Sequence, residues 1–124
     1  MYRITTALLF SLQLLAPAAA LAGDQGDPAQ KCDGSTVQII ECLKAQTAES
    51  DKRLNRAFET AIKASTPQQV EKLREAERLW ISFRDADCHF FGLGEGTISG
   101  VAAAQCLLNL TEARARELEG IGHQ

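Results

Sequence analysis

Four cysteines constrain this chain more than any other feature of its sequence: Cys32, Cys42, Cys88 and Cys106. An even number of cysteines in a small exported chain is typical of disulfide bonds, which supplement a modest hydrophobic core. The spacing does not suit zinc, because it contains no Cys-x-x-Cys pair and the only histidine beside a cysteine is His89. We therefore expect two structural disulfides, with no metal site and no cofactor.

The N-terminus predicts export. Residues 1–22 combine Arg3 with an uncharged apolar stretch and end in Ala20-Leu21-Ala22, which is typical of a cleaved signal peptide. Position 24, just beyond this segment, is Asp and not a cysteine that could carry a lipid. We expect a soluble periplasmic or secreted protein without a membrane anchor.

The charge balance bears on the class of partner. The chain has 13 Lys+Arg and 16 Asp+Glu, and cleavage would take the formal net charge from −3 to −4, since Arg3 is the single charged residue lost. A net negative chain without runs of Lys or Arg has no electrostatic basis for binding nucleic acid or anionic lipid. We expect a cationic protein as the partner.

Three helices are expected after an irregular N-terminal arm at residues 23–34. Ser35 and Gln38 have the spacing of a capping box, and they predict a helix over about 37–64. Thr66-Pro67-Gln68-Gln69 predicts the start of a second helix that runs to about 90. The glycines in 92–96 break that helix, and a third one restarts near Thr97 or Ser99 and ends before Gly120.

Apolar residues recur at helical spacing, and no segment alternates with the period of a strand. The second helix is expected to turn six residues inward: Val70, Leu73, Ala76, Trp80, Phe83 and Phe91. The fold class is therefore all-α. Residues 35–120 are predicted to form a three-helix antiparallel bundle, or a hairpin with a third helix.

An antiparallel hairpin of the first two helices, turning near Thr66, favours one disulfide pairing. Cys42 and Cys88 are nearly equidistant from that turn, so Cys42–Cys88 is favoured, with Cys32–Cys106 by elimination. The local pairing, Cys32–Cys42 with Cys88–Cys106, stays open because the arm is flexible.

Candidate chemical groups do not form a catalytic site. Asp85 and His89 share a helix face, yet they offer two ligands where zinc needs three or four. Ser82 and Ser99 lack a Gly-x-Ser-x-Gly frame, and the cysteines are expected to be bridged. We predict no catalytic residues and no enzymatic activity.

Polar residues beside the apolar stripes predict a partly buried network. Asp51 and Asn55 lie one turn apart on the first helix, Arg84 follows Trp80 on the second, and Thr111 and Arg114 lie on the third. The hairpin register brings Asp51 near Arg84, where an ion pair would fix the alignment of the two helices.

The sequence resembles the LprI-type lysozyme-inhibitor family over residues 32–118. The most specific match is Trp80-x-x-Phe83-Arg84-Asp85-x-x-Cys88, and the four cysteines agree as well. Asp51-x-x-Leu54-Asn55 and Thr111-x-x-Arg114 extend it, whereas Glu77 replaces the usual Gln and the lipidation cysteine is missing. The resemblance implies a bacterial, helical, disulfide-bonded envelope protein whose motif residues are structural: Asp51, Asn55, Trp80, Arg84, Asp85, Thr111 and Arg114.

The resemblance also implies inhibition of lysozyme, by binding the enzyme and blocking its active-site cleft. A protruding loop would have to enter that cleft, and the best candidate is the glycine-rich segment with its flanks: Phe90, Phe91, Leu93, Glu95, Thr97 and Ser99. The alternative is an immunity or accessory envelope protein that binds another secreted toxin or a component of the cell envelope.

Overall fold

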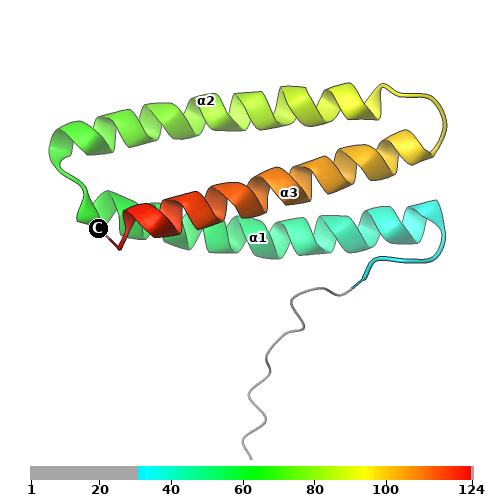
Figure 1. The fold of residues 1–124 in the computed structure, drawn as a ribbon, viewed down its shortest axis with the longest axis horizontal. Coiled ribbons are helices and arrows are strands. Elements are labelled where there is room, and N and C mark those ends of the chain that lie inside the picture. The colour runs from blue at the N-terminus through cyan, green and yellow to red at the C-terminus, as the bar shows by residue number, and fades with distance from the viewer. Residues whose placement is uncertain (1–30, 124) are drawn as a thin grey trace, which may run out of the picture. The chain divides into compact units, whose positions relative to one another are not determined.

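The computed structural model describes residues 31–123, which form three helices (Figure 1). The first, α1, spans Thr36–Ala64, α2 spans Pro67–Gly92 and α3 spans Ile98–Ile121. The all-α prediction is confirmed, and the helices begin and end close to the predicted residues. The predicted signal peptide and most of the N-terminal arm, residues 1–30, lie outside the described residues.

Reciprocal capping begins the first two helices. At α1 the Ser35 hydroxyl accepts from the Gln38 N–H, while Gln38 Oε1 accepts from the Ser35 N–H at 2.9 Å. Thr66 and Gln69 make the same pair of bonds at α2. Each box satisfies two backbone donors that the first helical turn leaves without partners, so these starts are fixed locally.

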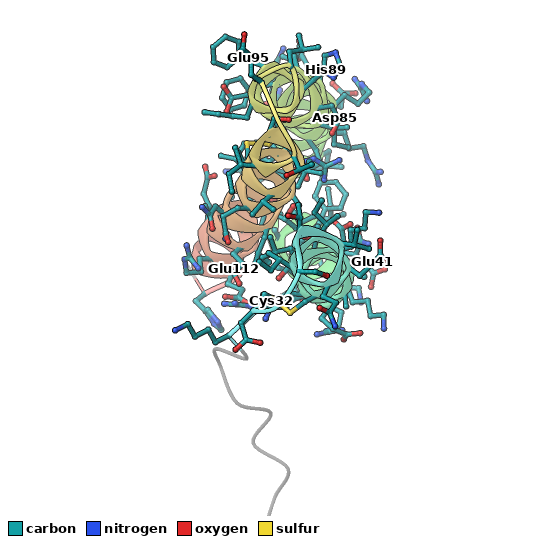
Figure 2. All side chains as sticks on the ribbon, turned by 90° about the vertical axis from the view of Figure 1, so that its right-hand side faces the viewer. Cys32, Glu41, Asp85, His89, Glu95 and Glu112 are labelled. Carbon is teal, nitrogen blue, oxygen red and sulfur yellow. A yellow bond between two sulfur atoms is a disulfide. The ribbon has the colours of Figure 1, made fainter. Side chains whose placement is uncertain are left out.

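The central element of the fold is α3. It runs parallel to α1 and antiparallel to α2, and it packs along both. By contrast, α1 and α2 are joined by a short turn and their backbones otherwise hardly approach each other. Seen end-on in Figure 2, α3 lies between α2 and α1 at the end of the molecule nearest the viewer.

This arrangement makes the favoured disulfide pairing wrong. The observed bonds are Cys32–Cys42 and Cys88–Cys106, with Cα–Cα distances of 5.6 and 5.4 Å. Cys42 and Cys88 do not pair because α3, rather than α1, lies along the cysteine-bearing end of α2. The local alternative is the correct one: one bond ties the arm to α1, and the other ties α2 to α3.

Two apolar clusters lie along the α1–α3 interface. One contains Leu43, Ala104 and Leu108, and partly buried Ile39, Ile40 and Val101 pack against it. The other contains Leu54, Ala57, Ala115 and Leu118, with Phe58, Leu73, Trp80 and Ile121 around it. Alanine at several of these positions allows the two helices to approach closely.

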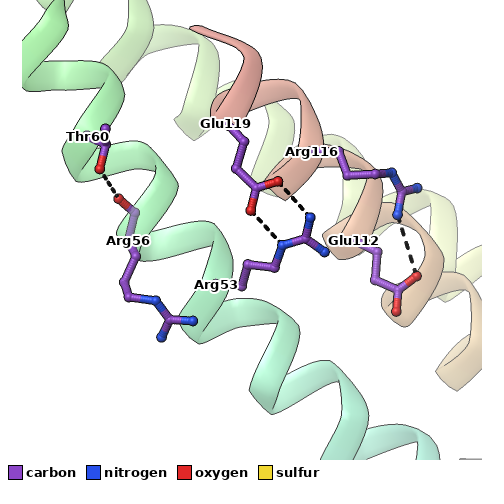
Figure 3. Close-up of polar contacts among 6 residues, drawn as sticks. All are labelled: Arg53, Arg56, Thr60, Glu112, Arg116 and Glu119. Carbon is purple, nitrogen blue, oxygen red and sulfur yellow. Dashed lines mark hydrogen bonds and ion pairs between the residues drawn. The ribbon is translucent and has the colours of Figure 1, made fainter. Parts of the chain in front are cut away.

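An ion pair reinforces the same interface, as Figure 3 shows. Arg53 of α1 donates from Nε and Nη2 to the two carboxylate oxygens of Glu119 on α3, each at 2.6 Å. This hydrogen-bonded guanidinium holds the pKa of the Glu119 carboxyl below its usual value. The pair therefore connects α3 to α1 across their interface.

The predicted inward face of α2 is only partly correct. Val70, Leu73 and Trp80 are half-buried, but Ala76, Phe83 and Phe91 are exposed. The line that faces the core instead runs through five positions: Leu73, Glu77, Trp80, Arg84 and Cys88. Phe83 lies one residue from this line, and a helix turns by about 100° per residue, so its ring points sideways into solvent.

Candidate functional site

A buried polar cluster joins α2 to α3 at the middle of the molecule. Arg114 of α3 donates from Nε and Nη2 to Glu77 Oε2 of α2, each at 2.9 Å, and from Nη1 to Glu117 at 2.8 Å. Burial alone would lower the pKa of Arg114, but its hydrogen bonds to Glu117 and Glu77 raise the pKa overall. Thr111, one turn before Arg114, is fully buried. The buried Arg114–Glu77 pair thus connects α3 to α2, whereas Glu117 is exposed.

The arginine of the family motif has three neighbours. Arg84 Nη1 lies 3.7 Å from Asp51 of α1, its Nη2 lies 2.8 Å from Asp85, and its guanidinium carbon lies 5.1 Å from the centre of the Trp80 ring. The guanidinium thus links α2 to α1 where their backbones are well separated. Asn55, one turn beyond Asp51, is exposed and lies outside this group.

The acidic and sulfur groups near the second disulfide do not form a competent metal site. Asp87, Cys88 and Cys106 place their ligand atoms within 4.8 Å of one another. The two sulfurs are bonded to each other, however, so a single carboxylate remains where zinc needs three or four ligands. Asp85 and His89 project from the same side of α2 (Figure 2), and Asp85 is engaged by Arg84.

Both disulfides lie toward the same end of the molecule. This end carries the start of α1, the end of α2 and the start of α3, and the loop between α2 and α3 projects beyond the helices there (Figure 1). Gly96 turns the loop with a φ of +75°, in the left-handed region that favours glycine. The Ser99 hydroxyl donates to the Gly96 carbonyl at 2.8 Å, and this hydrogen bond stabilises the turn at Gly96.

Large apolar side chains are exposed around this loop. The exposed fractions of Phe90, Leu93 and Ile98 are 70%, 71% and 68%, and Val37 at the start of α1 is exposed at the same end. We call Leu93, Glu95, Thr97 and Ile98 the loop surface; all four side chains are exposed. Exposed large apolar side chains at one end of a molecule are typical of a protein–protein contact.

The sequence predicts most of this region as a partner-binding loop, but neither Ile98 nor Val37 was among the predicted residues. Both residues lie in the first turn of a helix. Their exposure follows from the arrangement of the three helices and has no clear signal in the local sequence.

An open groove runs between α2 and α3 beside the Cys88–Cys106 bond. Its lining comes from both helices: Asp87, Phe91, Ala102, Gln105, Cys106, Asn109 and Leu110. It is open along its length, unlike the enclosed pockets that hold small molecules. Phe91 therefore belongs to the groove, whereas Phe90 points away into solvent.

The fold and these surfaces define a small disulfide-bonded helical protein whose most prominent feature is an exposed apolar end. A model of the family described as "Lysozyme inhibitor LprI" matches residues 27–118. The chain therefore belongs to the LprI lysozyme-inhibitor family.

The chain is also similar to two curated proteins of low identity. The chain is 27% identical to uncharacterized protein R02472 of Rhizobium meliloti (strain 1021), over 91% of this chain and 90% of the relative. It is 25% identical to uncharacterized protein YecT of Escherichia coli (strain K12), over 70% of this chain and 65% of the relative. No solved structure matches significantly. Within residues 31–123, no helix is long and apolar enough to cross a membrane.

Proposed function

We propose that this protein is an exported inhibitor that binds lysozyme and blocks its active-site cleft with the loop between α2 and α3. The observation that carries the proposal is the position of the exposed loop surface at the end of the molecule that both disulfides constrain. A loop that is already held in place loses little conformational entropy on binding, and more of its contact energy therefore appears as affinity.

The chemistry of the loop surface suits a groove that binds glycan. Leu93 and Ile98 supply apolar anchors, while Glu95 and Thr97 between them supply a carboxylate and a hydroxyl. Thr97 makes no capping hydrogen bond with its side chain at the start of α3, so its hydroxyl is available to a partner. Phe90 and Phe91 lie behind the loop and Ser99 stabilises it.

The charge of the chain favours the same partner. The net charge is negative before and after removal of residues 1–22, whereas lysozymes are usually cationic. Opposite charges accelerate encounter, and salt screens this effect. Binding in this manner needs no catalytic group.

The test is lysis of a bacterial cell-wall suspension by a panel of purified lysozymes, with and without the oxidised protein from residue 23 onward. Near-stoichiometric protein should slow lysis by at least one lysozyme, and reduced protein should inhibit less. If no lysozyme is inhibited at micromolar concentration, the proposal is wrong. Recovery of a different secreted toxin or envelope protein by pull-down would then support the alternative of an immunity or accessory protein.

A further inference from the structure

A second exposed apolar surface runs along α2, away from the core. Ala76, Leu79, Phe83, Ala86 and Phe90 follow one another at intervals of three, four, three and four residues, and all five are exposed. We call these five residues the outer stripe. A 3-4 repeat places side chains along one seam of a helix, and it is the spacing with which two helices interdigitate. Neither α1 nor α3 covers this seam.

We propose that the outer stripe is the interface of an antiparallel homodimer, in which the α2 helices of two copies of this chain pack together. A two-fold axis midway between Phe83 and Ala86 places each Phe83 against Ala86 of the second copy. The same axis places Leu79 against Phe90, because these two positions are equidistant from the midpoint. At the centre of the interface each Phe83 thus meets an alanine, and the stripe is complementary to itself there.

A parallel dimer does not give this fit. Phe83 would then face Phe83 and Ala86 would face Ala86, so one layer would be crowded and the next would contain a void. The antiparallel arrangement also separates like charges. Glu75 and Asp87 lie on opposite flanks of the stripe. The two-fold axis places neither carboxylate against the same residue of the second copy.

The exposed area is large enough for a weak to moderate dimer. The exposed fractions of Leu79, Phe83 and Phe90 are 66%, 57% and 70%. With the two alanines, the stripe exposes on the order of 400–500 Å² of apolar side chain per copy, so a dimer would bury ~1,000 Å², near the lower limit for specific interfaces. Because α2 is already folded, pairing requires little further ordering.

Sedimentation equilibrium of the oxidised protein from residue 23 onward tests the interface. The wild-type protein should reach twice the monomer mass at tens of micromolar, and Phe83→Glu should weaken the association at least tenfold because it buries a charge in the seam. Ile81→Glu is the matched control. Ile81 is an exposed apolar residue of the same helix outside the stripe, so this variant should dimerise normally. Circular dichroism should show that both variants keep the helical fold.

Mixing two variants tests the orientation. Phe83→Glu and Ala86→Lys should each be monomeric alone, but together they should form a heterodimer, because the antiparallel axis places the new carboxylate against the new ammonium. A parallel arrangement gives no such pair and no recovery. Wild-type protein that stays monomeric at several hundred micromolar, dimerisation unaffected by Phe83→Glu, or a mixture that stays monomeric would overturn the proposal. None of these outcomes depends on lysozyme inhibition.

Discussion

Arg114 of α3 and Glu77 of α2 form a buried ion pair in which two guanidinium nitrogens share one carboxylate oxygen at 2.9 Å. The side chains are only 8% and 11% exposed. A buried pair of this kind need not add net stability, but either partner is costly to leave alone. The pair therefore fixes how α2 aligns with α3 more than it increases the free energy of unfolding.

Arg114→Met should lower the free energy of unfolding by about 3–5 kcal/mol, since it leaves the Glu77 carboxylate buried without its partner. The double variant Arg114→Met/Glu77→Met should recover most of this loss. Urea unfolding followed by circular dichroism gives both values. Glu77→Gln is the milder comparison, because an amide oxygen can still accept from Arg114; its cost should be near 1 kcal/mol. A loss below about 1 kcal/mol for Arg114→Met would contradict this account.

The Arg53–Glu119 pair predicts a pH dependence. Arg53 lowers the pKa of Glu119 in the folded state, so the pair stabilises the fold above the pKa of an unfolded glutamate, and this contribution is lost as the pH falls through the lowered pKa. Both side chains are more than one-third exposed, which limits the effect. Glu119→Gln should cost about 0.5 kcal/mol at neutral pH and nothing once the wild-type carboxyl is protonated.

The comparison for this experiment is Glu112→Gln. Glu112 pairs with Arg116 of its own helix at 3.8 Å and so does not link two helices (Figure 3). Unfolding in urea at pH 7 and at the lowest pH where the protein remains folded should show a pH-dependent difference for Glu119→Gln alone. An equal difference at both pH values would show that the charge of Glu119 does not matter.

The disulfide pairing, and the stability that one of the bonds contributes, can each be measured. Partial proteolysis without reductant, followed by mass spectrometry, should recover peptides joined through Cys32–Cys42 and Cys88–Cys106. Replacing the Cys88–Cys106 pair by alanines should cost about 3 kcal/mol, because the bond closes a loop of fewer than 20 residues. A peptide that joins Cys42 to Cys88 would contradict the arrangement in which α3 is central.

The proposed electrostatic attraction to lysozyme predicts a salt effect on association. The association rate, measured by stopped-flow fluorescence, should fall as ionic strength rises, while the dissociation rate should change little. Glu95→Lys should lower the association rate and weaken its salt dependence. Glu112→Lys, which makes the same change of charge on a helix away from the loop, should have a smaller effect. An association rate that is independent of salt would contradict the claim that opposite charges accelerate binding.

The helices could be predicted from sequence because their starts are local. Ser35 with Gln38, and Thr66 with Gln69, fix the first turns within four residues, and the structure contains both capping boxes. The glycines after Phe91 likewise end α2 near the predicted position. These features depend on contacts between near neighbours in the sequence, so they do not require knowledge of how the helices pack.

The packing could not be predicted in the same way. A hairpin of α1 and α2 follows naturally from the short turn at Thr66, but it does not reveal that α3 occupies the space between them. The charged Glu77 of α2 faces the core because it pairs with Arg114 of α3, which lies far along the chain. The aromatic Phe83 of the same helix faces solvent. Hydrophobicity alone assigns these two residues to the wrong faces.

The most direct test of the central claim is the concentration of protein that halves lysozyme activity, measured for the variant Leu93→Ser/Ile98→Ser. Both side chains belong to the loop surface, and losing two apolar anchors should raise that concentration at least about tenfold. Leu79→Ser is the control, because Leu79 is as exposed as Ile98 but lies on the outer stripe; it should inhibit like the wild-type protein. Inhibition unchanged by the double variant would contradict the assignment of the loop surface as the surface that binds lysozyme.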